Sequence, residues 1–120
     1  MNAQINTKVE SLSYKGLLYE RYPSDTLMSW NEAKTYVHTL KQQSMKPWRL
    51  ATVEELEKLA HKPNNSLSKL GFVWSKDEED YQNAWIMDFD KNLYYLRNKT
   101  SKFAVLCVQD TALKRSIKFF

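Results

Sequence analysis

Two helix-start signals of the same kind lie in the first half of this chain, and they constrain its fold more than any other feature. Ser29 is followed three residues later by Glu32, and Thr52 is followed in the same way by Glu55. In such a capping box the hydroxyl accepts a hydrogen bond from the first turn of a helix, and the glutamate accepts one from the amide of the capping residue. The two boxes therefore predict two helices, which begin directly after Ser29 and Thr52.

The apolar residues behind each box recur at intervals of three and four, which is the spacing of one helix face. They are Trp30, Ala33, Val37 and Leu40, widened by Tyr36, in the first segment and Val53, Leu56, Leu59 and Ala60 in the second. We expect the first helix to end near Gln43. Pro63 stops the second helix because proline has no amide hydrogen to donate. Residues 62–69 are expected to form a polar loop.

Short strand patterns surround the two helical segments. Residues 12–21 alternate around Gly16, which indicates one strand with a bulge or a close backbone approach, and residues 23–25 are typical of a turn. Along Ala84–Phe89, one face would carry Trp85, Met87 and Phe89. The strands expected after the helices are Phe72–Ser75, Ala84–Phe89, Leu93–Arg97 and Phe103–Val108.

The turns between these strands predict how they pair. A tight turn at residues 90–92 joins two of them into a hairpin, and residues 98–101 turn the chain once more. The last strand is apolar throughout, as expected for a strand buried on both faces. A strand, two helices and then several strands is the order of an α+β fold. The prediction is two helices packed on a twisted antiparallel β-sheet.

The length of 120 residues fits a single domain. We expect residues 1–11 to be a loose lead-in, 12–109 the domain and 110–120 a basic and apolar tail. The net charge of +4 is modest, and part of it comes from Lys114, Arg115 and Lys118 in that tail. A nucleic-acid partner is therefore not expected. No apolar run approaches the ~20 residues of a membrane-spanning helix, so no transmembrane segment is predicted.

Cys107 is the single cysteine. An internal disulfide framework and a cysteine-based zinc site are both excluded for that reason. The first residues lack the apolar segment of a signal peptide. Both features allow a cytoplasmic protein, whereas a chain that begins after a removed export signal would look the same.

Six short blocks together resemble one known family. They are Lys15–Tyr19, Ser29–Ala33, Trp48–Leu56, Phe72–Ser75, Ala84–Phe89 and Val105–Val108. The third block reads Trp-Arg-Leu-Ala-Thr-Val-Glu-Glu-Leu, close to the family signature Trp-Arg-Leu-Pro-Thr-x-x-Glu-Leu. In this order the blocks resemble the C-terminal domain of the Legionella collagen-like adhesin, over about residues 14–109. That family, long catalogued as a domain of unknown function, is similar to C-type-lectin-like folds.

The resemblance implies a C-type-lectin-like α+β fold, a non-enzymatic adhesion role, and a place at the cell surface or in the periplasm. For the resembling adhesin the partner class is sulfated glycosaminoglycan, which the positive net charge of this chain allows. Two positions depart from the family pattern. Ala51 replaces the proline of the signature, and Val37 occupies the place of a helix cysteine that often pairs with the cysteine matched by Cys107.

The resemblance also singles out a set of structural signature residues. They are Trp30, Trp48, Arg49, Glu55, Trp74, Trp85 and Cys107. Arg49 and Glu55 are expected to pair and to fix the second helix to the sheet, so that removing one partner would destabilise the fold; a ligand-binding pair is the alternative. The four tryptophans are expected in the core rather than as stacking platforms, with Trp85 the most exposed of them.

No catalytic residues are predicted. Formylglycine-generating enzymes share this general fold and use cysteine chemistry, but Cys107 lies inside an apolar strand with no histidine close in the sequence. Asp88 and Asp90 would share a strand face as a glycosidase pair, yet Asp90 is expected to start the following turn.

No metal or cofactor is predicted either. His38 and His61 match no metal-ligand spacing and are expected at the surface or as a helix cap. The acidic residues 77–80 are expected to form a solvated loop, with calcium as the alternative because carboxylates are its preferred ligands. The Glu-Pro-Asn and Trp-Asn-Asp strings with which C-type lectins bind calcium and sugar are absent.

The predicted hairpin and the turns after it carry the residue types of recognition surfaces. The candidate ligand-binding residues are Lys91, Asn92, Tyr94, Tyr95, Arg97, Asn98 and Lys99. The hypothesis is that Lys91, Arg97 and Lys99 form an edge that faces an anion, with Tyr94 or Tyr95 giving stacking area. An ordinary sheet surface is the alternative.

Two functional classes therefore stay open. The first is a recognition or adhesion module that binds a glycan or protein ligand, with an anionic ligand favoured by the charge. The second is a structural component of a larger bacterial envelope or surface assembly without a free small ligand. In that second class the sheet edge or the tail at residues 113–120 would form the contact, between copies of the chain or with other proteins.

Overall fold

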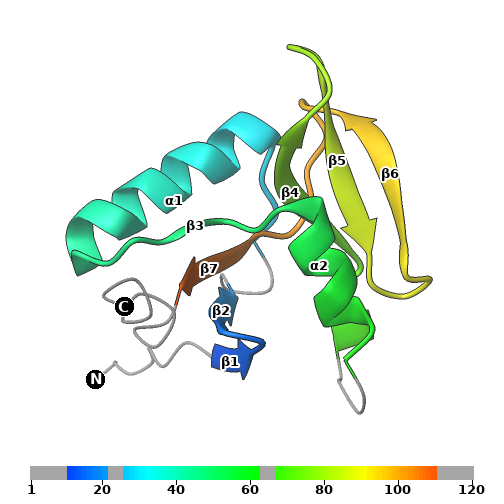
Figure 1. Cartoon of the computed structure of the whole chain (residues 1–120). Coiled ribbons are helices and arrows are strands. Elements are labelled where there is room, and N and C mark those ends of the chain that lie inside the picture. The colour runs from blue at the N-terminus through cyan, green and yellow to red at the C-terminus, as the bar shows by residue number, and fades with distance from the viewer. Residues whose placement is uncertain (1–10, 22–25, 63–66, 111–120) are drawn as a thin grey trace.

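The computed structural model describes residues 11–21, 26–62 and 67–110 of the chain (Figure 1). Its helices are α1 (Trp30–Ser44) and α2 (Val53–Ala60), with a short 3-10 helix at Leu67–Leu70. Its strands are β1 (Ser11–Tyr14), β2 (Leu17–Arg21), β3 (Arg49–Leu50), β4 (Phe72–Glu78), β5 (Asn83–Asp88), β6 (Leu93–Asn98) and β7 (Leu106–Asp110). Of the lead-in predicted at 1–11, residues 1–10 lie outside the described residues and Ser11 belongs to β1. The turn at 23–25 and the tail from 111 also lie outside the described residues.

Both predicted helices are confirmed, and both begin with a complete capping box. The Ser29 hydroxyl accepts a hydrogen bond from the Glu32 amide at 3.2 Å, and the Ser29 amide donates to the Glu32 carboxylate at 2.9 Å. The Thr52 and Glu55 pair repeats this at 3.1 and 2.9 Å. Helix α1 ends where Met45 takes a left-handed conformation with φ 60°, and α2 ends before Pro63.

The strands form two antiparallel sheets rather than the single sheet that the sequence predicts. One has the order β1-β2-β7-β3, and the other has the order β4-β5-β6. Strand β7 pairs with β2 on one side and with β3 on the other, so neither of its edges is left for β4. The sheets are connected instead through the segment before β7, where Ala104 bridges Val73 in a parallel arrangement.

Residues 12–21 form a hairpin and not the single strand that we expected. Lys15 and Gly16 both have positive φ, 50° and 81°, and make the turn between β1 and β2. The glycine is therefore needed to reverse the chain rather than for a bulge, because a positive φ is accessible to glycine at little cost.

Other boundaries also differ from the predictions. The final strand begins at Leu106 rather than Phe103 and includes Asp110, which was expected to belong to the tail. Phe103 instead bridges Met28. Half of the acidic run, Asp77 and Glu78, belongs to β4 and not to a loop. The loop predicted at 62–69 contains the first residues of the 3-10 helix.

The core consists of two packed clusters. One includes Leu56, Val73, Met87 and Val108, and the other includes Trp30, Trp74, Ile86 and Cys107. Strand β5 contributes to both, because Ile86 and Met87 point to opposite faces and are both fully buried. The side chains of β5 alternate between its two faces as predicted, but each face packs against a core cluster, so neither is left entirely to solvent.

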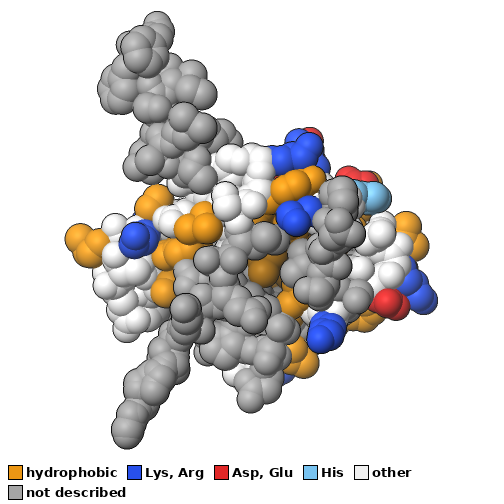
Figure 2. All heavy atoms as spheres, turned by 90° about the horizontal axis from the view of Figure 1, so that it is seen from below, with side chains coloured by type: hydrophobic (Ala, Val, Ile, Leu, Met, Phe, Trp, Pro, Cys, Tyr) orange, Lys and Arg blue, Asp and Glu red, His pale blue; other side chains and the backbone are white. Residues whose placement is uncertain are grey.

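The surface left outside this core mixes apolar and basic side chains. Seen from below (Figure 2), Lys and Arg side chains lie between hydrophobic ones and few acidic side chains are visible among the described residues. Neither α1 nor α2 is long and apolar enough to cross a membrane, and no other helix of the described residues is.

Candidate functional site

Arg49 connects α2 to the four-stranded sheet. Its two terminal nitrogens donate to the two carboxylate oxygens of Glu55 at 2.9 and 2.8 Å, and one of them also reaches Asp110 on β7 at 3.4 Å. Burial by itself would raise the pKa of Glu55, but the hydrogen bonds from Arg49 and Thr52 lower it overall. Arg49 and Glu55 therefore bond to each other and to neighbouring groups of the protein, which is the geometry of a pair that stabilises the fold.

Three of the four tryptophans are buried. The indole nitrogen of Trp30 donates to the Ser75 carbonyl at 2.9 Å, and that of Trp74 donates to the Met28 carbonyl at 2.8 Å. Trp48 is 6% exposed. Trp85 is only half-buried and meets Tyr94 edge-to-face at 5.8 Å. The tryptophans are therefore mainly packing residues, although Trp30 and Trp48 also form part of a groove described below.

Other residues that the sequence offered as candidates for chemistry are buried in the core or cap a turn or helix. Cys107 is buried in the same cluster as Val37, the residue at the helix-cysteine position of the resembling family. Asp88, and not Asp90, caps the hairpin turn, because its carboxylate accepts hydrogen bonds from the amides of Asp90 and Lys91. His61 caps the end of α2, with its ring nitrogen 2.8 Å from the Glu57 carbonyl.

Three of the acids at 77–80 already have partners. Asp77 accepts a hydrogen bond from the Val53 amide at 2.7 Å, which holds the start of α2 against β4. Glu78 pairs with Lys99. Asp80 accepts from the amides of Gln82 and Asn83, which lower its pKa. Within the described ranges, no three acidic, histidine or cysteine side chains converge as a metal site would require.

The predicted ligand-binding residues of the hairpin do not converge on one surface. Successive side chains of β6 point to opposite faces. Tyr94 lies with Trp85 on one face. Tyr95 and Arg97 lie on the other, where the guanidinium carbon of Arg97 is 5.0 Å from the centre of the Tyr95 ring. Lys91 and Asn92 lie at the turn before β6, whereas Asn98 ends the strand and Lys99 follows it.

Lys99 in particular cannot serve in the proposed anion-facing edge. It is only 7% exposed, its ammonium pairs with Glu78, and it lies over the Trp30 ring at 4.3 Å. Lys91, Arg97 and Lys99 therefore do not form a common edge. The pleat of the strand and the ion pair of Lys99 with Glu78 keep their charged groups apart.

A basic groove lies elsewhere, between α1, β3 and the end of β4. Its volume is about 470 Å³, and we call it the α1–β3 groove. Its floor is apolar, with Trp30, Val37, Trp48 and Leu50. Its polar side chains are Lys34, His38 and Lys41 from α1, Arg49 from β3, and Lys76 and Glu78 from β4.

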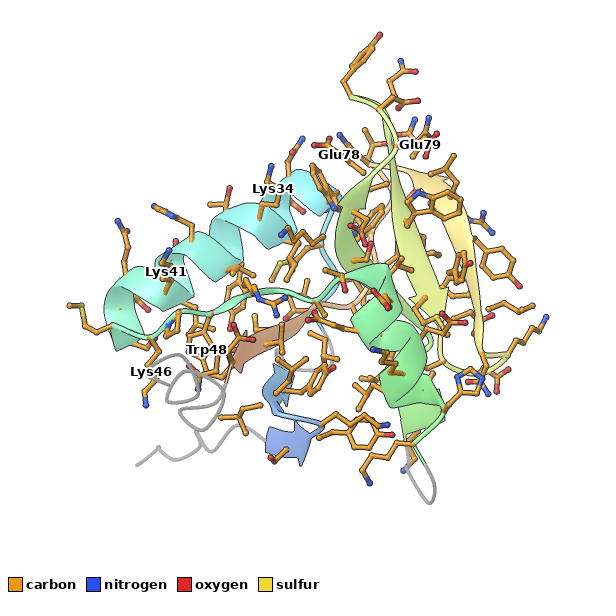
Figure 3. All side chains as sticks on the ribbon, in the orientation of Figure 1. Lys34, Lys41, Lys46, Trp48, Glu78 and Glu79 are labelled. Carbon is orange, nitrogen blue, oxygen red and sulfur yellow. The ribbon has the colours of Figure 1, made fainter. Side chains whose placement is uncertain are left out.

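Helix α1 forms one wall of this groove, because the helical period places three of its polar side chains on the same face. Lys34, His38 and Lys41 are spaced by four and three residues, so they lie along one face of α1. Figure 3 shows Lys34 and Lys41 along the helix, with Trp48 near the start of β3. The Lys34 ammonium lies 4.4 Å from the centre of the Trp30 ring. An ammonium at this distance from an indole ring is attracted by the negative face of the ring, and the rest of the Lys34 side chain stays exposed to water.

The charges of the groove are not balanced within the described part of the chain. Lys34, Lys41 and Lys76 make no ion pair with any described residue, and the one acid that lines the groove, Glu78, is already paired with Lys99. An excess of positive charge over an aromatic floor attracts anions. The spacing of Lys34, His38 and Lys41 is visible in the sequence, but their meeting with Arg49 and Lys76 depends on the fold.

The Glu78–Lys99 pair gives a test of this assignment of charges. We expect Glu78→Gln to lower the free energy of unfolding more than Lys99→Met does, because the glutamine variant leaves a buried ammonium without its carboxylate. The methionine variant leaves only a half-exposed carboxylate, which water solvates. Urea unfolding of both variants measures the order, and a larger loss for Lys99→Met would contradict it.

Comparisons with known proteins agree with this architecture. The family model described as "Lcl C-terminal domain" matches residues 9–109. Botrocetin superposes with a TM-score of 0.55 at 12% identity, over 84% of this chain and 96% of that one. EMS16, described as an antagonist of the collagen receptor integrin alpha2beta1, superposes with a TM-score of 0.59 at 17% identity, over 84% and 97%.

A third structure, a complex of a von Willebrand factor A1 domain mutant with botrocetin, matches with a TM-score of 0.56 at 15% identity, over 84% of this chain and 96% of that one. These matches confirm the predicted C-type-lectin-like α+β fold. At such identities the likeness is one of fold alone. No curated protein matches the sequence.

Proposed function

Because the chain belongs to the Lcl C-terminal domain family, we propose that it is a non-enzymatic recognition module that binds an anionic ligand in the α1–β3 groove. The observation that carries this proposal is the excess of lysines over the tryptophan floor that have no ion-pair partner in the part of the chain that the structure describes. A sulfated glycan is the favoured ligand, since it offers repeated negative charges along a chain and apolar ring faces for the aromatic floor.

The fold relatives support a binding role in general terms. One of the solved structures is a complex of botrocetin with a von Willebrand factor domain, and EMS16 is described as an antagonist of an integrin. An acidic protein surface is therefore the second candidate ligand for the same groove. Both ligands would be recognised by the same lysines, and the probes below separate them.

A thermal-melt series is the direct test of the proposal. Heparin at a hundred times its dissociation constant should stabilise the fold by about 2.7 kcal/mol, which is a shift of several degrees for a domain of this size. Raising the salt concentration should abolish the shift because screening weakens exposed charges. If neither heparin nor an acidic peptide moves the melting temperature, the assembly role becomes the better explanation.

Charge reversal locates the site. We expect the double variant Lys41→Glu and Lys76→Glu to weaken heparin binding at low salt by tenfold or more, because two attractions become repulsions. Isothermal titration calorimetry measures this loss. The matched control is Lys91→Glu, an exposed lysine at the turn between β5 and β6. A loss with the control and none with the double variant would place the site on the hairpin instead.

A further inference from the structure

A second hollow, of about 420 Å³, lies where three distant parts of the chain meet. They are the start of α1, the loop between β4 and β5, and the turn that follows β6. Backbone hydrogen bonds tie them together, since the Lys99 amide donates to the Gln82 carbonyl at 2.8 Å and the Trp30 amide donates to the Lys99 carbonyl at 3.0 Å. Asp80 holds the loop by accepting from the Gln82 amide. The frame of the hollow is therefore fixed before any ligand binds.

The side chains of this hollow are polar but uncharged, with one exception. Asn31, Gln82, Asn98 and Thr100 supply amides and a hydroxyl. The exception, Lys99, has its charge taken up by Glu78. In this the hollow differs from the α1–β3 groove, whose lysines make no ion pair with a described residue. No free charge is present among the described residues that line it, so an ion is not the ligand that it favours.

Several of these polar groups are available to a ligand. The side-chain carbonyl oxygen of Asn98 accepts from the backbone amide and the hydroxyl of Thr100, at 2.9 and 2.7 Å, and the side-chain NH2 group of Asn98 makes no hydrogen bond to another described residue. The side chains of Asn31 and Gln82 make no hydrogen bond to other described residues. Each primary amide both donates and accepts, which matches a hydroxyl group that does the same.

Tyr81 adds an aromatic surface. Its side chain is 85% exposed at the loop between β4 and β5, and it lines the hollow. An exposed ring of this kind offers rigid apolar area and a polar hydroxyl at small conformational cost. A ring next to several amides is a combination that suits a ligand with an apolar face and a rim of hydroxyl groups.

We propose that this hollow binds an uncharged saccharide unit, with Tyr81 against the apolar face of the sugar ring and Asn31, Gln82 and Asn98 hydrogen-bonded to its hydroxyls. The volume is within the roughly 300–1,000 Å³ of small-molecule sites. The site is separate from the α1–β3 groove and takes a different class of ligand, because the Glu78–Lys99 pair and the Trp30 ring lie between the two.

Titration of the full ¹⁵N-labelled chain with glucose, galactose, mannose and N-acetylglucosamine tests the proposal. We expect at least one of them to produce saturable shifts at the amides of Asn31, Gln82 and Thr100, with a dissociation constant in the millimolar range and no dependence on salt. Tyr81→Ala should weaken that binding at least fivefold. Tyr94→Ala, which removes another exposed tyrosine, and Lys41→Glu should leave it unchanged.

The outcomes are distinct from those of the heparin experiment. No shift at these amides with any of the four sugars, shifts confined to other segments, or equal binding by Tyr81→Ala would each overturn the saccharide site. A preserved melting temperature and spectrum of Tyr81→Ala show that the variant is folded. Heparin, by contrast, should shift amides of α1 and β3 and should do so only at low salt.

Discussion

Trp74→Ala is expected to lower the free energy of unfolding by about 3–5 kcal/mol, the range for removing a large aromatic side chain from a core. Trp74 is fully buried and meets Phe103 edge-to-face at 5.0 Å. The substitution leaves a cavity and also removes the indole donor from the Met28 carbonyl. Since domains of this kind are stable by only about 5–15 kcal/mol, the loss would be a large part of the total.

The matched control is Trp85→Ala, on the neighbouring strand. Trp85 is half-buried and belongs to neither core cluster, so its removal should cost about 1–2 kcal/mol. Urea unfolding monitored by circular dichroism measures both variants, and the difference should appear in the midpoint with little change in slope. Equal losses would mean that the packing around Trp74 is not as described.

Glu55→Ala is the second substitution with a large expected effect, about 2–3 kcal/mol. It removes two hydrogen bonds from Arg49, which are charge-assisted, and the acceptor for the Thr52 amide. The side chains of Arg49 and Glu55 are 31% and 21% exposed. Water therefore partly replaces the lost contacts, and the loss of stability stays below that for a fully buried pair.

Glu54→Gln is the natural control for this position. Glu54 lies in the same first turn of α2 and pairs with Lys58 at 3.8 Å, but both side chains are largely exposed. Such surface pairs contribute little, and we expect a change of less than about 0.5 kcal/mol. Thermal or urea unfolding distinguishes the two variants. A comparable loss for both would show that the Arg49 pairing does not stabilise the domain.

The same carboxylate predicts a dependence on pH. The pKa of Glu55 is lower in the folded chain than its ordinary value of about 4.3, so the unfolded chain binds the proton more readily. Its contribution is present above about pH 5 and is lost as the pH falls through the lowered pKa. Glu55→Gln should therefore show a shallower loss of stability on acidification than the wild type, with part of the slope left.

That remaining slope has identified sources. Hydrogen bonding to the Ser29 amide lowers the pKa of Glu32, pairing with Lys99 lowers that of Glu78, and the Gln82 and Asn83 amides lower that of Asp80. All three shifts have the same sign as that of Glu55. Each group therefore adds stability at neutral pH that is lost in acid.

The parts of the fold that follow from local interactions were predictable from the sequence. A capping box involves residues three apart, so Ser29 with Glu32 and Thr52 with Glu55 set the helix starts without any distant contact. The hairpin of β5 and β6 is local for the same reason. The Arg49–Glu55 pair also lies within a short stretch, and the family resemblance pointed to it.

The division into two sheets, by contrast, depends on which strands, distant in sequence, pair with the two edges of each strand. Strand β7 pairs with both β2 and β3, and nothing in its apolar sequence specifies those partners. The turn at Lys15 and Gly16 was missed because the apolar residues of β1 and β2 together read as one alternating run.

The candidate binding sites show the same limit most clearly. The sequence placed Lys91, Arg97 and Lys99 together because they are close along the chain, but the pleat of β6 and the Glu78–Lys99 pair separate them. The groove joins α1 to Arg49 and Lys76, and the polar hollow joins Asn31, Gln82 and Asn98. Helices, turns and caps arise from neighbours in sequence, whereas these surfaces arise from long-range strand pairing and from the packing of α1 on the strands, which bring together side chains that share no local pattern.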